Sequence, residues 1–355
     1  LHSFPTRRSS DLFLEPLKER GYFAGAFRKV HQGPQFDKRW DFYGTAKDPW
    51  EEFFAARPKD RPFFLHVGFT EPHRPYFAGG WKPPHDPGSV AVPPFLPDAP
   101  AVRADLAIYY DYIARMDAMC GELLALLDRE NLTGNTLVMF TGDNGMAFPR
   151  AKGTLYDPGI RVPFMASWPG RIRPGGLRNE LVSHADIAAT LLEAAGARPL
   201  RRTEGRSFLP LLEGRAMEPR KEVFAERNWH DNFDPIRCVR TDRWKLILNA
   251  APHFPYRPAL DIEESPSWKT FQQMAGRRAI KPEHLSLIAP NRPALELYDL
   301  QGDPNEFTNR AGLPETRDVQ EDLTRRLSSW MEQTRDYLPP GSTSGGLARG
   351  WPVTL

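Results

Sequence analysis

Two continuous apolar runs, separated by one long amphipathic segment, constrain the fold of this chain most. The runs cover residues 62–69 and 136–141 and consist mainly of aliphatic and aromatic residues, which is typical of parallel strands buried on both faces. Between residues 104 and 129, apolar side chains recur every three or four positions, and this spacing predicts a helix with one broad buried face. Strand, helix and strand together predict a crossover unit, and therefore a mostly parallel α/β sheet flanked by helices.

The segments around this unit carry weaker but readable patterns. Before residue 220 we expect further helices over 13–20, 50–56 and 185–195, and further strands over 22–27 and 160–167. After residue 220 the pattern changes, and we expect an exposed antiparallel strand over 236–249, another strand over 295–300 and an amphipathic helix over 319–335. The proline-rich segment 81–100 has no period and predicts a long loop.

This change of pattern predicts two domains. Residues 13–232 are expected to form the α/β domain, and residues 233–355 a smaller α+β domain that carries an antiparallel sheet and ends in a tail. Residues 1–12 show no structural period, so we interpret them as a leader foreign to the fold.

The charge balance restricts the classes of partner. Lys and Arg number 47 against 45 Asp and Glu, a formal net charge of +2, so no strong global field would attract nucleic acid or an anionic membrane. No apolar run approaches the roughly 20 residues of a membrane span. We therefore expect neither nucleic acid nor a membrane as partner. The two cysteines, Cys120 and Cys238, predict free thiols, and we assign neither as a nucleophile.

Polar side chains follow three of the predicted strands, where ligands bind in open parallel sheets. They are Lys29 and His31 after 22–27, His73 after 62–69, and Asp143, Asn144 and, further on, Lys152 after 136–141. Taken singly, each is better explained as a surface charge, a loop histidine or a turn than as a functional residue. Together they offer oxygen ligands for a divalent cation, cations for an oxyanion and imidazoles for proton transfer. The combination predicts hydrolysis of an anionic ester.

Several motifs resemble, in family order, the sulfatases of the alkaline phosphatase superfamily. They are Gly21-Tyr22 with Lys29-Val30-His31-Gln32-Gly33, residues 62–76, Thr141-Gly142-Asp143-Asn144-Gly145, Lys152-Gly153-Thr154-Leu155-Tyr156, Gly159-Ile160-Arg161-Val162-Pro163, Trp168-Pro169-Gly170, residues 186–196 and residues 296–306. The resemblance covers about residues 13–335 and implies an alkaline-phosphatase-like fold. Residues 69–74, 148–150 and 234–237 look most like the sulfamidase and heparan-sulfate-type members.

The resemblance also implies a division of labour at the site. It implies that Asp143 and Asn144 bind a calcium-type ion and that Lys29 and His31 lie beside a formylglycine nucleophile. It also implies that His73 and Lys152 contact the sulfate and its leaving atom. The implied substrate is a sulfated saccharide. His230 and Asp231 are candidates for holding the sugar, with a capping or loop role as an equal alternative. The family implies a periplasmic, extracellular or lysosomal location, although no signal peptide is visible, and the oligomeric state stays open.

One expected departure from the family concerns the nucleophile. Formylglycine is made from the first residue of a Cys/Ser-x-Pro-x-Arg motif upstream of the Lys-x-His segment. We expect this motif and the family's paired aspartates to be missing, so that the chain is an N-terminally truncated hydrolase, inactive as it stands. Two alternatives remain open: a phosphodiesterase or phosphonate monoester hydrolase of the same superfamily, and a non-catalytic protein that binds sulfated glycans.

Overall fold

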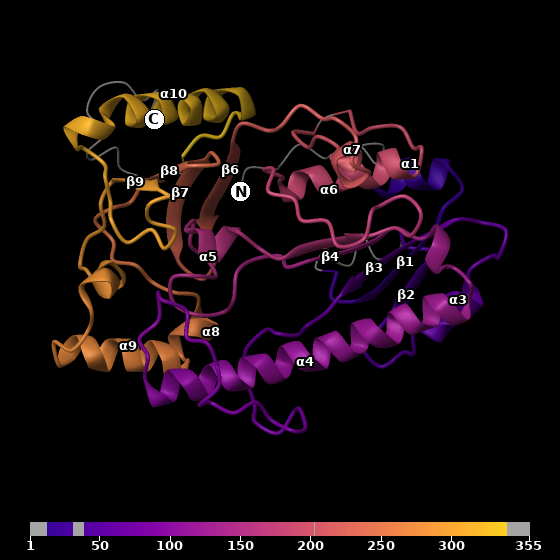
Figure 1. Cartoon of the computed structure of the whole chain (residues 1–355), viewed down its shortest axis with the longest axis horizontal. Helices are drawn as coiled ribbons and strands as arrows, with labels where there is room; N and C mark the ends of the chain where they lie inside the picture. The colour runs from indigo at the N-terminus through magenta and orange to yellow at the C-terminus, as the bar shows by residue number, and fades with distance from the viewer. Residues whose placement is uncertain (1–12, 31–38, 202, 339–355) are drawn as a thin grey trace. The chain divides into compact units, whose positions relative to one another are not determined.

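The computed structural model describes residues 13–30, 39–201 and 203–338, which divide into two compact units (Figure 1). The first unit comprises residues 1–72, 115–139 and 166–219, and the second comprises residues 73–114, 140–165 and 220–355. The domain boundary expected at residue 233 stays a prediction. The expected leader, residues 1–12, lies outside the described residues, as does the end of the expected tail.

The first unit contains a parallel sheet of three strands in the order β2-β1-β3. Its strands are β1 (Phe23–Arg28), β2 (Phe42–Gly44) and β3 (Phe63–Gly68). Two expected helices accompany them, α1 (Leu14–Glu19) and α3 (Glu51–Ala56). Gly25 of β1 has no room for a side chain, because a Cβ there would lie 2.3 Å from the ring of Phe53. The helix therefore packs directly on the strand's backbone.

Helix α6 (His184–Ala194) begins where the sequence predicts. Ser183 accepts a hydrogen bond from the backbone N–H of Ala185, and the Asp186 carboxylate accepts one from the N–H of Ser183. This reciprocal capping satisfies backbone donors that the first helical turn leaves open. The short helix α7 (Leu209–Leu212), which follows in the same unit, was not expected.

The long helix α4 (Pro100–Arg129) connects β3 to β4 (Val138–Thr141), after the short 3-10 helix η2 (Thr133–Asn135). The expected crossover within one sheet is not found among the described strands, because β4 pairs with β5 (Phe164–Ser167) in a separate two-stranded sheet. The strand expected over 160–167 was also too long. Its expected first residue, Ile160, belongs instead to helix α5 (Asp157–Ile160). Pro158 lies in the first turn of this helix, where the backbone N–H that proline lacks would have no helical partner.

The second unit contains an antiparallel sheet in the order β6-β7-β8-β9. Its strands are β6 (Val223–Trp229), β7 (Phe233–Arg240), β8 (Trp244–Asn249) and β9 (Leu295–Asp299). The prediction of a single exposed strand over 236–249 is wrong in two respects. The segment is a hairpin of two strands, and both strands are largely buried. The reason is that each face of the hairpin is covered.

Helix α10 (Arg317–Thr334), which was expected, covers one face of this sheet (Figure 1). Leu246 and Leu248 pack there against Leu323 and Leu327. The opposite face forms a second cluster that includes Cys238, Ile247 and Leu155. The alternating side chains of β7 and β8 thus enter two different cores, which explains why alternation did not mean exposure.

Two helices between β8 and β9 escaped prediction, α8 (Leu260–Glu263) and α9 (Pro266–Gly276). Ser265 caps α9 by accepting a hydrogen bond from the backbone N–H of Trp268. Ile262, Trp268 and Phe271 are buried in one cluster with Leu287 of the 3-10 helix η3 (Pro282–Leu287). A further 3-10 turn, η4 (Pro314–Thr316), precedes α10.

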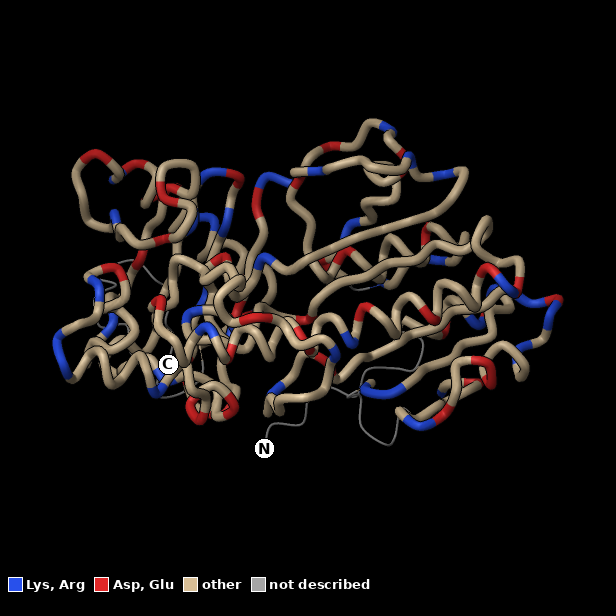
Figure 2. The backbone as a smooth tube through the Cα atoms, turned by 60° about the horizontal axis from the view of Figure 1, so that its bottom comes forward, with Lys and Arg blue, Asp and Glu red and all other residues tan. Residues whose placement is uncertain are grey.

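The distribution of charge agrees with the small net charge. Figure 2 shows acidic and basic residues interspersed along the backbone of each unit. No helix in the described part of the chain is both long and apolar enough to cross a membrane. Both cysteines are free, as expected; Cys238 is buried, and burial raises the pKa of its thiol to about 11.

Candidate active site

Two residues predicted from separate motifs, His73 and Lys152, meet at the carboxylate of Asp261 in the second unit. Lys152 Nζ lies 2.7 Å from Asp261 Oδ2, and His73 Nε2 lies 3.9 Å from the same oxygen. The Lys152 side chain is 9% exposed and that of His73 is 45% exposed. Nδ1 of His73 faces the backbone carbonyl of Arg74. The imidazole ring therefore has a backbone carbonyl on one side and a carboxylate on the other.

His73 is held in place by its neighbour Arg74, which is buried. The Arg74 guanidinium makes a two-pronged contact with Asp105 of α4, at 2.9 and 2.8 Å, and donates a further hydrogen bond to the carbonyl of Ala147. Ser267 of α9 donates to the same Asp105 carboxylate at 2.5 Å. Paired, planar contacts of this kind fix direction as well as distance. The loop that carries His73 is thus fastened to two helices.

Lys152 is held by the loop between β4 and α5. Its backbone N–H donates to the carbonyl of Met146. Arg150, which is fully buried, donates to the backbone carbonyl of Glu306 and lies 3.8 Å from the ring centre of Tyr156. The loop also packs tightly on α5, since a Cβ on Gly145 would lie 1.9 Å from the carbonyl oxygen of Pro158. These contacts leave Lys152 little freedom to move.

Asp143 and Asn144 follow β4 directly and are exposed. Their turn is anchored by the N–H of Gly142, which donates to the carbonyl of Pro163. Within the described residues, no group of three or more His, Cys, Asp or Glu side chains surrounds a position for a metal ion. The pair nevertheless has the right chemistry for calcium, because carboxylate and amide oxygens are its usual ligands, although it wants six to eight of them.

His230 and Asp231, the candidates for holding a sugar, lie after β6 and contact each other. His230 Nδ1 is 2.9 Å from Asp231 Oδ2, and the same oxygen accepts a hydrogen bond from the N–H of Leu260 at 2.8 Å. This backbone hydrogen bond lowers the pKa of Asp231, and His230 and Lys152 lower it further. The pair therefore fixes the start of α8, the helix that carries Asp261.

The remaining two predicted residues belong to the first unit. Lys29 follows β1 and is half-buried, and its N–H donates to the carbonyl of Gly68 at the end of β3. A Cβ on Gly68 would lie 1.8 Å from the Lys29 carbonyl oxygen, so only glycine allows this approach. His31 lies outside the described residues.

The second unit also contains a buried ionic cluster that the motifs did not reveal. Lys245 Nζ lies 2.5 Å from Asp157 Oδ1 and 2.8 Å from Glu306 Oε1, and its side chain is 0% exposed. Burial raises the pKa of Glu306; for Asp157 burial acts in the same direction, but Lys245 and Arg240 outweigh it and lower the pKa. Every ion here has a buried partner, so we assign the cluster to structure.

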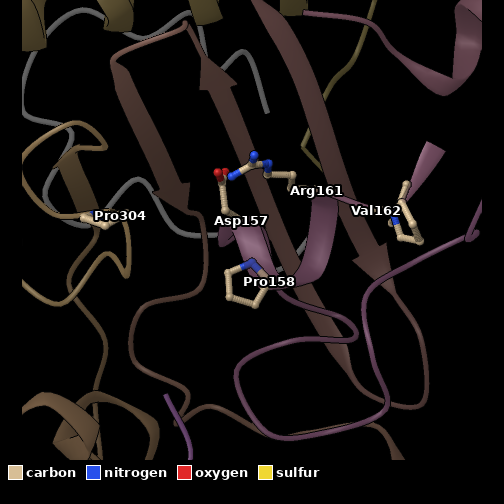
Figure 3. Close-up of a pocket in the computed structure, with 6 residues that line it drawn as sticks. Asp157, Pro158, Arg161, Val162 and Pro304 are labelled. Carbon is tan, nitrogen blue, oxygen red and sulfur yellow. The ribbon is translucent and has the colours of Figure 1, made fainter. Parts of the chain in front are cut away.

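Beside this cluster lies an open hollow of about 500 Å³, bordered by Asp157, Pro158, Arg161 and Pro304 (Figure 3). Valine and proline residues make up the rest of its lining, and none of the predicted site residues borders it. Its Asp157 is already paired with Lys245. The pairing of Lys152, His73 and Asp261 offers the richer chemistry, and we take that group as the candidate site.

Sequence reasoning missed two parts of this group. Asp261 lies 109 residues from Lys152 along the chain, in a segment without a recognisable motif. Only one member of the Arg74–Asp105 pair could be recognised from the sequence, because Arg74 belongs to a family-like segment while Asp105 lies in an amphipathic helix. The one sequence feature that marks Asp105 is that it is a charged residue near the start of that helix.

Comparison with known proteins agrees with the fold and the motifs. The family model "Sulfatase" matches residues 41–197, and the model "N-sulphoglucosamine sulphohydrolase, C-terminal" matches residues 150–267. Human N-sulphoglucosamine sulphohydrolase is 31% identical over 388 residues, which cover 94% of this chain and 76% of that protein. An ulvan-active sulfatase of Formosa agariphila is 30% identical, over 91% of this chain and 64% of that protein.

Solved structures support the same fold. The phosphonate monoester hydrolase of Agrobacterium radiobacter superposes with a TM-score of 0.64 at 18% identity, over 91% of this chain and 80% of that one. A protein solved in complex with its substrate D-glucosamine-2-N,6-O-disulfate gives 0.60 at 17% identity, over 92% and 83%. The expected class, a parallel α/β sheet with an additional antiparallel sheet, is confirmed. The chain belongs to the sulfatase family.

One expectation about the nucleophile was wrong as stated. Ser3-Phe4-Pro5-Thr6-Arg7 does have the spacing Ser-x-Pro-x-Arg. It lies within residues 1–12, which are not described by the structure. The paired aspartates are missing from the sequence, as expected, because no two aspartates are adjacent in it.

Proposed function

We propose that this chain is part of a sulfuric-ester or sulfamate hydrolase that acts on sulfated saccharides. The observation that carries the proposal is the shared contact of Lys152 and His73 with Asp261, in a chain of the sulfatase family. Two cationic donors, one of them an imidazole, are what a sulfate and its leaving oxygen or nitrogen require. The likeness to N-sulphoglucosamine sulphohydrolase supports a sugar substrate.

In this proposal each side chain has one task. Lys152 neutralises charge on the sulfate oxygens, because a fixed cation in a partly dry pocket stabilises charge that develops in the transition state. His73, protonated, gives its proton to the leaving atom of the sugar. Lys29 and His31 flank the nucleophile in this assignment, which rests on the family resemblance. A sulfated saccharide therefore contacts cations from more than one segment of the chain.

Asp143 and Asn144 would hold a calcium ion, and the ion when bound supplies Lewis-acid stabilisation of the sulfate. Their exposed oxygens fit such an ion in type. They provide two ligands where calcium wants six to eight. We therefore propose that further ligands come from sequence upstream of this chain, together with the residue that becomes formylglycine.

The nucleophile of the proposed hydrolase either lies upstream of this chain or is Ser3, the first residue of the Ser-x-Pro-x-Arg motif. We favour an upstream nucleophile, because residues 1–12 carry no structural period and no paired aspartates. The chain of 355 residues is then expected to show no appreciable turnover of aryl sulfates. If it does turn over an aryl sulfate, and Ser3→Ala abolishes that activity while His73→Ala does so too, Ser3 is the nucleophile and the truncation proposal fails.

A phosphonate monoester or phosphodiester hydrolase is the second candidate, favoured by the fold of the Agrobacterium enzyme. A non-catalytic protein that binds sulfated glycans is the third, and equilibrium binding without turnover by a chain with its upstream sequence would favour it. The family resemblance further suggests a periplasmic, extracellular or lysosomal location.

The deciding experiment uses Lys152 in the protein with its upstream sequence restored. Lys152→Gln removes the charge but keeps a donor for Asp261, so the fold should survive. We expect turnover of glucosamine N-sulfate to fall about 10²- to 10³-fold, the usual loss for one charge-stabilising group. Lys281→Gln is the matched control, since Lys281 is exposed in the same unit. An unchanged rate in Lys152→Gln removes its assigned role, and faster hydrolysis of aryl phosphate than of sulfate by the wild type would favour the second candidate.

A further inference from the structure

Arg227 of β6 connects the antiparallel sheet to the loop that carries Lys152. Its Nη1 donates a hydrogen bond to the backbone carbonyl of Gly153, the residue that follows Lys152. A Cβ on Gly153 would lie 2.9 Å from the same nitrogen, so the guanidinium lies directly against the backbone of the loop. The contact joins residues 74 positions apart in the chain, and no motif in the sequence indicates it.

Arg227 is itself held by Asp234 of β7. Its Nη2 contacts the Asp234 carboxylate, and the two side chains are 13% and 8% exposed. Burial lowers the pKa of Arg227 to about 10; Tyr256 opposes this shift and Arg292 adds to it. Arg227 is therefore still protonated at neutral pH, and its planar guanidinium donates to a carboxylate and to a carbonyl at the same time.

A cavity of about 110 Å³ lies beside this contact. Its lining includes Gly153, Arg227, Asp234 and Arg292. Protein atoms are missing on the cavity side of the loop, so the loop has fewer packing contacts there than a close-packed interior would provide. The hydrogen bond from Arg227 is therefore not easily replaced by packing when it is removed.

We propose that Arg227 is a positioning residue, which fixes the backbone at Gly153 so that the Lys152 ammonium stays where the sulfate binds. The inference rests on the proposed function, in which Lys152 neutralises the sulfate. A lysine ammonium ends a flexible four-carbon stem, so it keeps one place only when the backbone is held as well. Asp261 holds the ammonium at 2.7 Å, while Met146 and Arg227 hold the backbone at residues 152 and 153.

Arg227→Lys tests this role without removing a charge from the sheet. The new ammonium still pairs with Asp234, which also keeps its two-pronged contact with Arg292, so no buried carboxylate loses its partner and the fold should survive. Lysine lacks the planar fork of arginine, so the hydrogen bond to Gly153 should be lost while the ion pair remains.

Hydrogen exchange in the 355-residue chain measures whether the loop loosens. The amides of Lys152 and Thr154 donate to the carbonyls of Met146 and Ala151 within the loop. In Arg227→Lys we expect both amides to exchange about 10-fold faster, the effect of losing one hydrogen bond, while amides of β8 keep their rates.

Turnover measures whether the position of the loop matters to catalysis. In the protein with its upstream sequence restored, Arg227→Lys should lower the turnover of glucosamine N-sulfate about 10- to 100-fold, because a displacement of about 1 Å costs up to that much. In the Lys152→Gln background the same change should cost less than about 2-fold, because Arg227 acts through Lys152. Structural damage alone would lower the rate by the same factor in both backgrounds.

Arg243→Lys is the matched control, since it makes the same chemical change at an arginine paired with Asp299 in an exposed part of the same sheet. It should alter neither exchange in the loop nor turnover. Unchanged exchange at Lys152 in Arg227→Lys would overturn the positioning role, and so would equal losses of turnover in both backgrounds. If the restored wild type turns over neither glucosamine N-sulfate nor an aryl sulfate, the proposed function fails, and the exchange rates still decide whether Arg227 holds the loop.

Discussion

Strands β3 and β8, one from each of the two main sheets, each contain four apolar residues out of six but differ in how far they are buried. In β8 of the antiparallel sheet, five of the six residues are buried, including Lys245. In β3 of the parallel sheet, none of the six is buried, although the strand reads Phe63-Phe64-Leu65-His66-Val67-Gly68. The sequence patterns predicted strands in both segments but gave their depth wrongly, since residues 62–69 were expected to be buried on both faces and residues 236–249 to be exposed.

What covers a sheet decides its burial. Both faces of β8 meet clusters of side chains, with α10 on one face and Leu155 and its neighbours on the other. Residues of β3 do join a cluster with α3 and α4, but they remain partly exposed there. Sheets with parallel strands are normally covered on both faces. Strand β3 departs from this rule in the described structure, because its residues are only partly covered.

The largest effect is expected from the buried charge of β8. Lys245→Met removes the only cation that contacts both Asp157 and Glu306 within the described structure. Two carboxylates then lie buried with less compensation, and breaking a buried ion pair costs about 3–5 kcal/mol. Chemical denaturation measures the loss. Lys281→Met, an exposed lysine of the same unit, should change the free energy of unfolding by less than about 0.5 kcal/mol.

The leucines of the two sheets give the direct test of the comparison. Leu246→Ala empties a fully buried position in β8 and should cost about 2–5 kcal/mol. Leu65→Ala, at a half-buried position in β3, should cost about 1 kcal/mol, because part of its side chain already meets solvent. Urea unfolding of each variant provides both values. Equal losses of unfolding free energy would mean that β3 is as well covered as β8, and the contrast between these two strands would disappear.

A smaller effect concerns the end of β4. Calcium should bind weakly to this chain, and Asp143→Ala should weaken it further, because Asp143 and Asn144 supply only part of the ligand set. Calorimetric titration with calcium compares the wild-type chain with Asp143→Ala. The control is Asp242→Ala, which changes an aspartate in a turn outside the proposed site. Tight calcium binding that survives Asp143→Ala would place the metal elsewhere. Affinity that rises when upstream sequence is restored would support the shared site.

Local patterns predicted much of the fold, because they act within a few residues. The helix α6, the spacing of α4 and the strand β1 were all predicted from the sequence. Ile160 was misassigned because Asp157 and Pro158 start a helical turn that the apolar run masked. Motifs likewise located Lys152 and His73.

The carboxylate that joins them was not readable, since Asp261 meets Lys152 only through folding across 109 residues. The buried state of Lys152 was missed for the same reason: in sequence it resembles an exposed lysine. Contacts between charged residues far apart in the chain produce no periodic pattern in the sequence. The motifs therefore identified Lys152 and His73, and only the structure identified Asp261 as their partner.

The smallest effect is expected at the solvent-facing end of β6, where Asp231 caps α8. The hydrogen bond from Leu260 N–H, followed by His230 and Lys152, lowers the pKa of Asp231 in the folded protein. A carboxyl whose folded pKa lies below its unfolded value of about 3.9 stabilises the fold above that pH, and the contribution fades as pH falls through the folded pKa. The amide of Leu260 should therefore exchange with solvent faster below about pH 4, relative to amides of β8. Asp231→Asn keeps an acceptor but cannot titrate, so its exchange at Leu260 should lose this acid dependence. If the variant retains the dependence, another group controls α8.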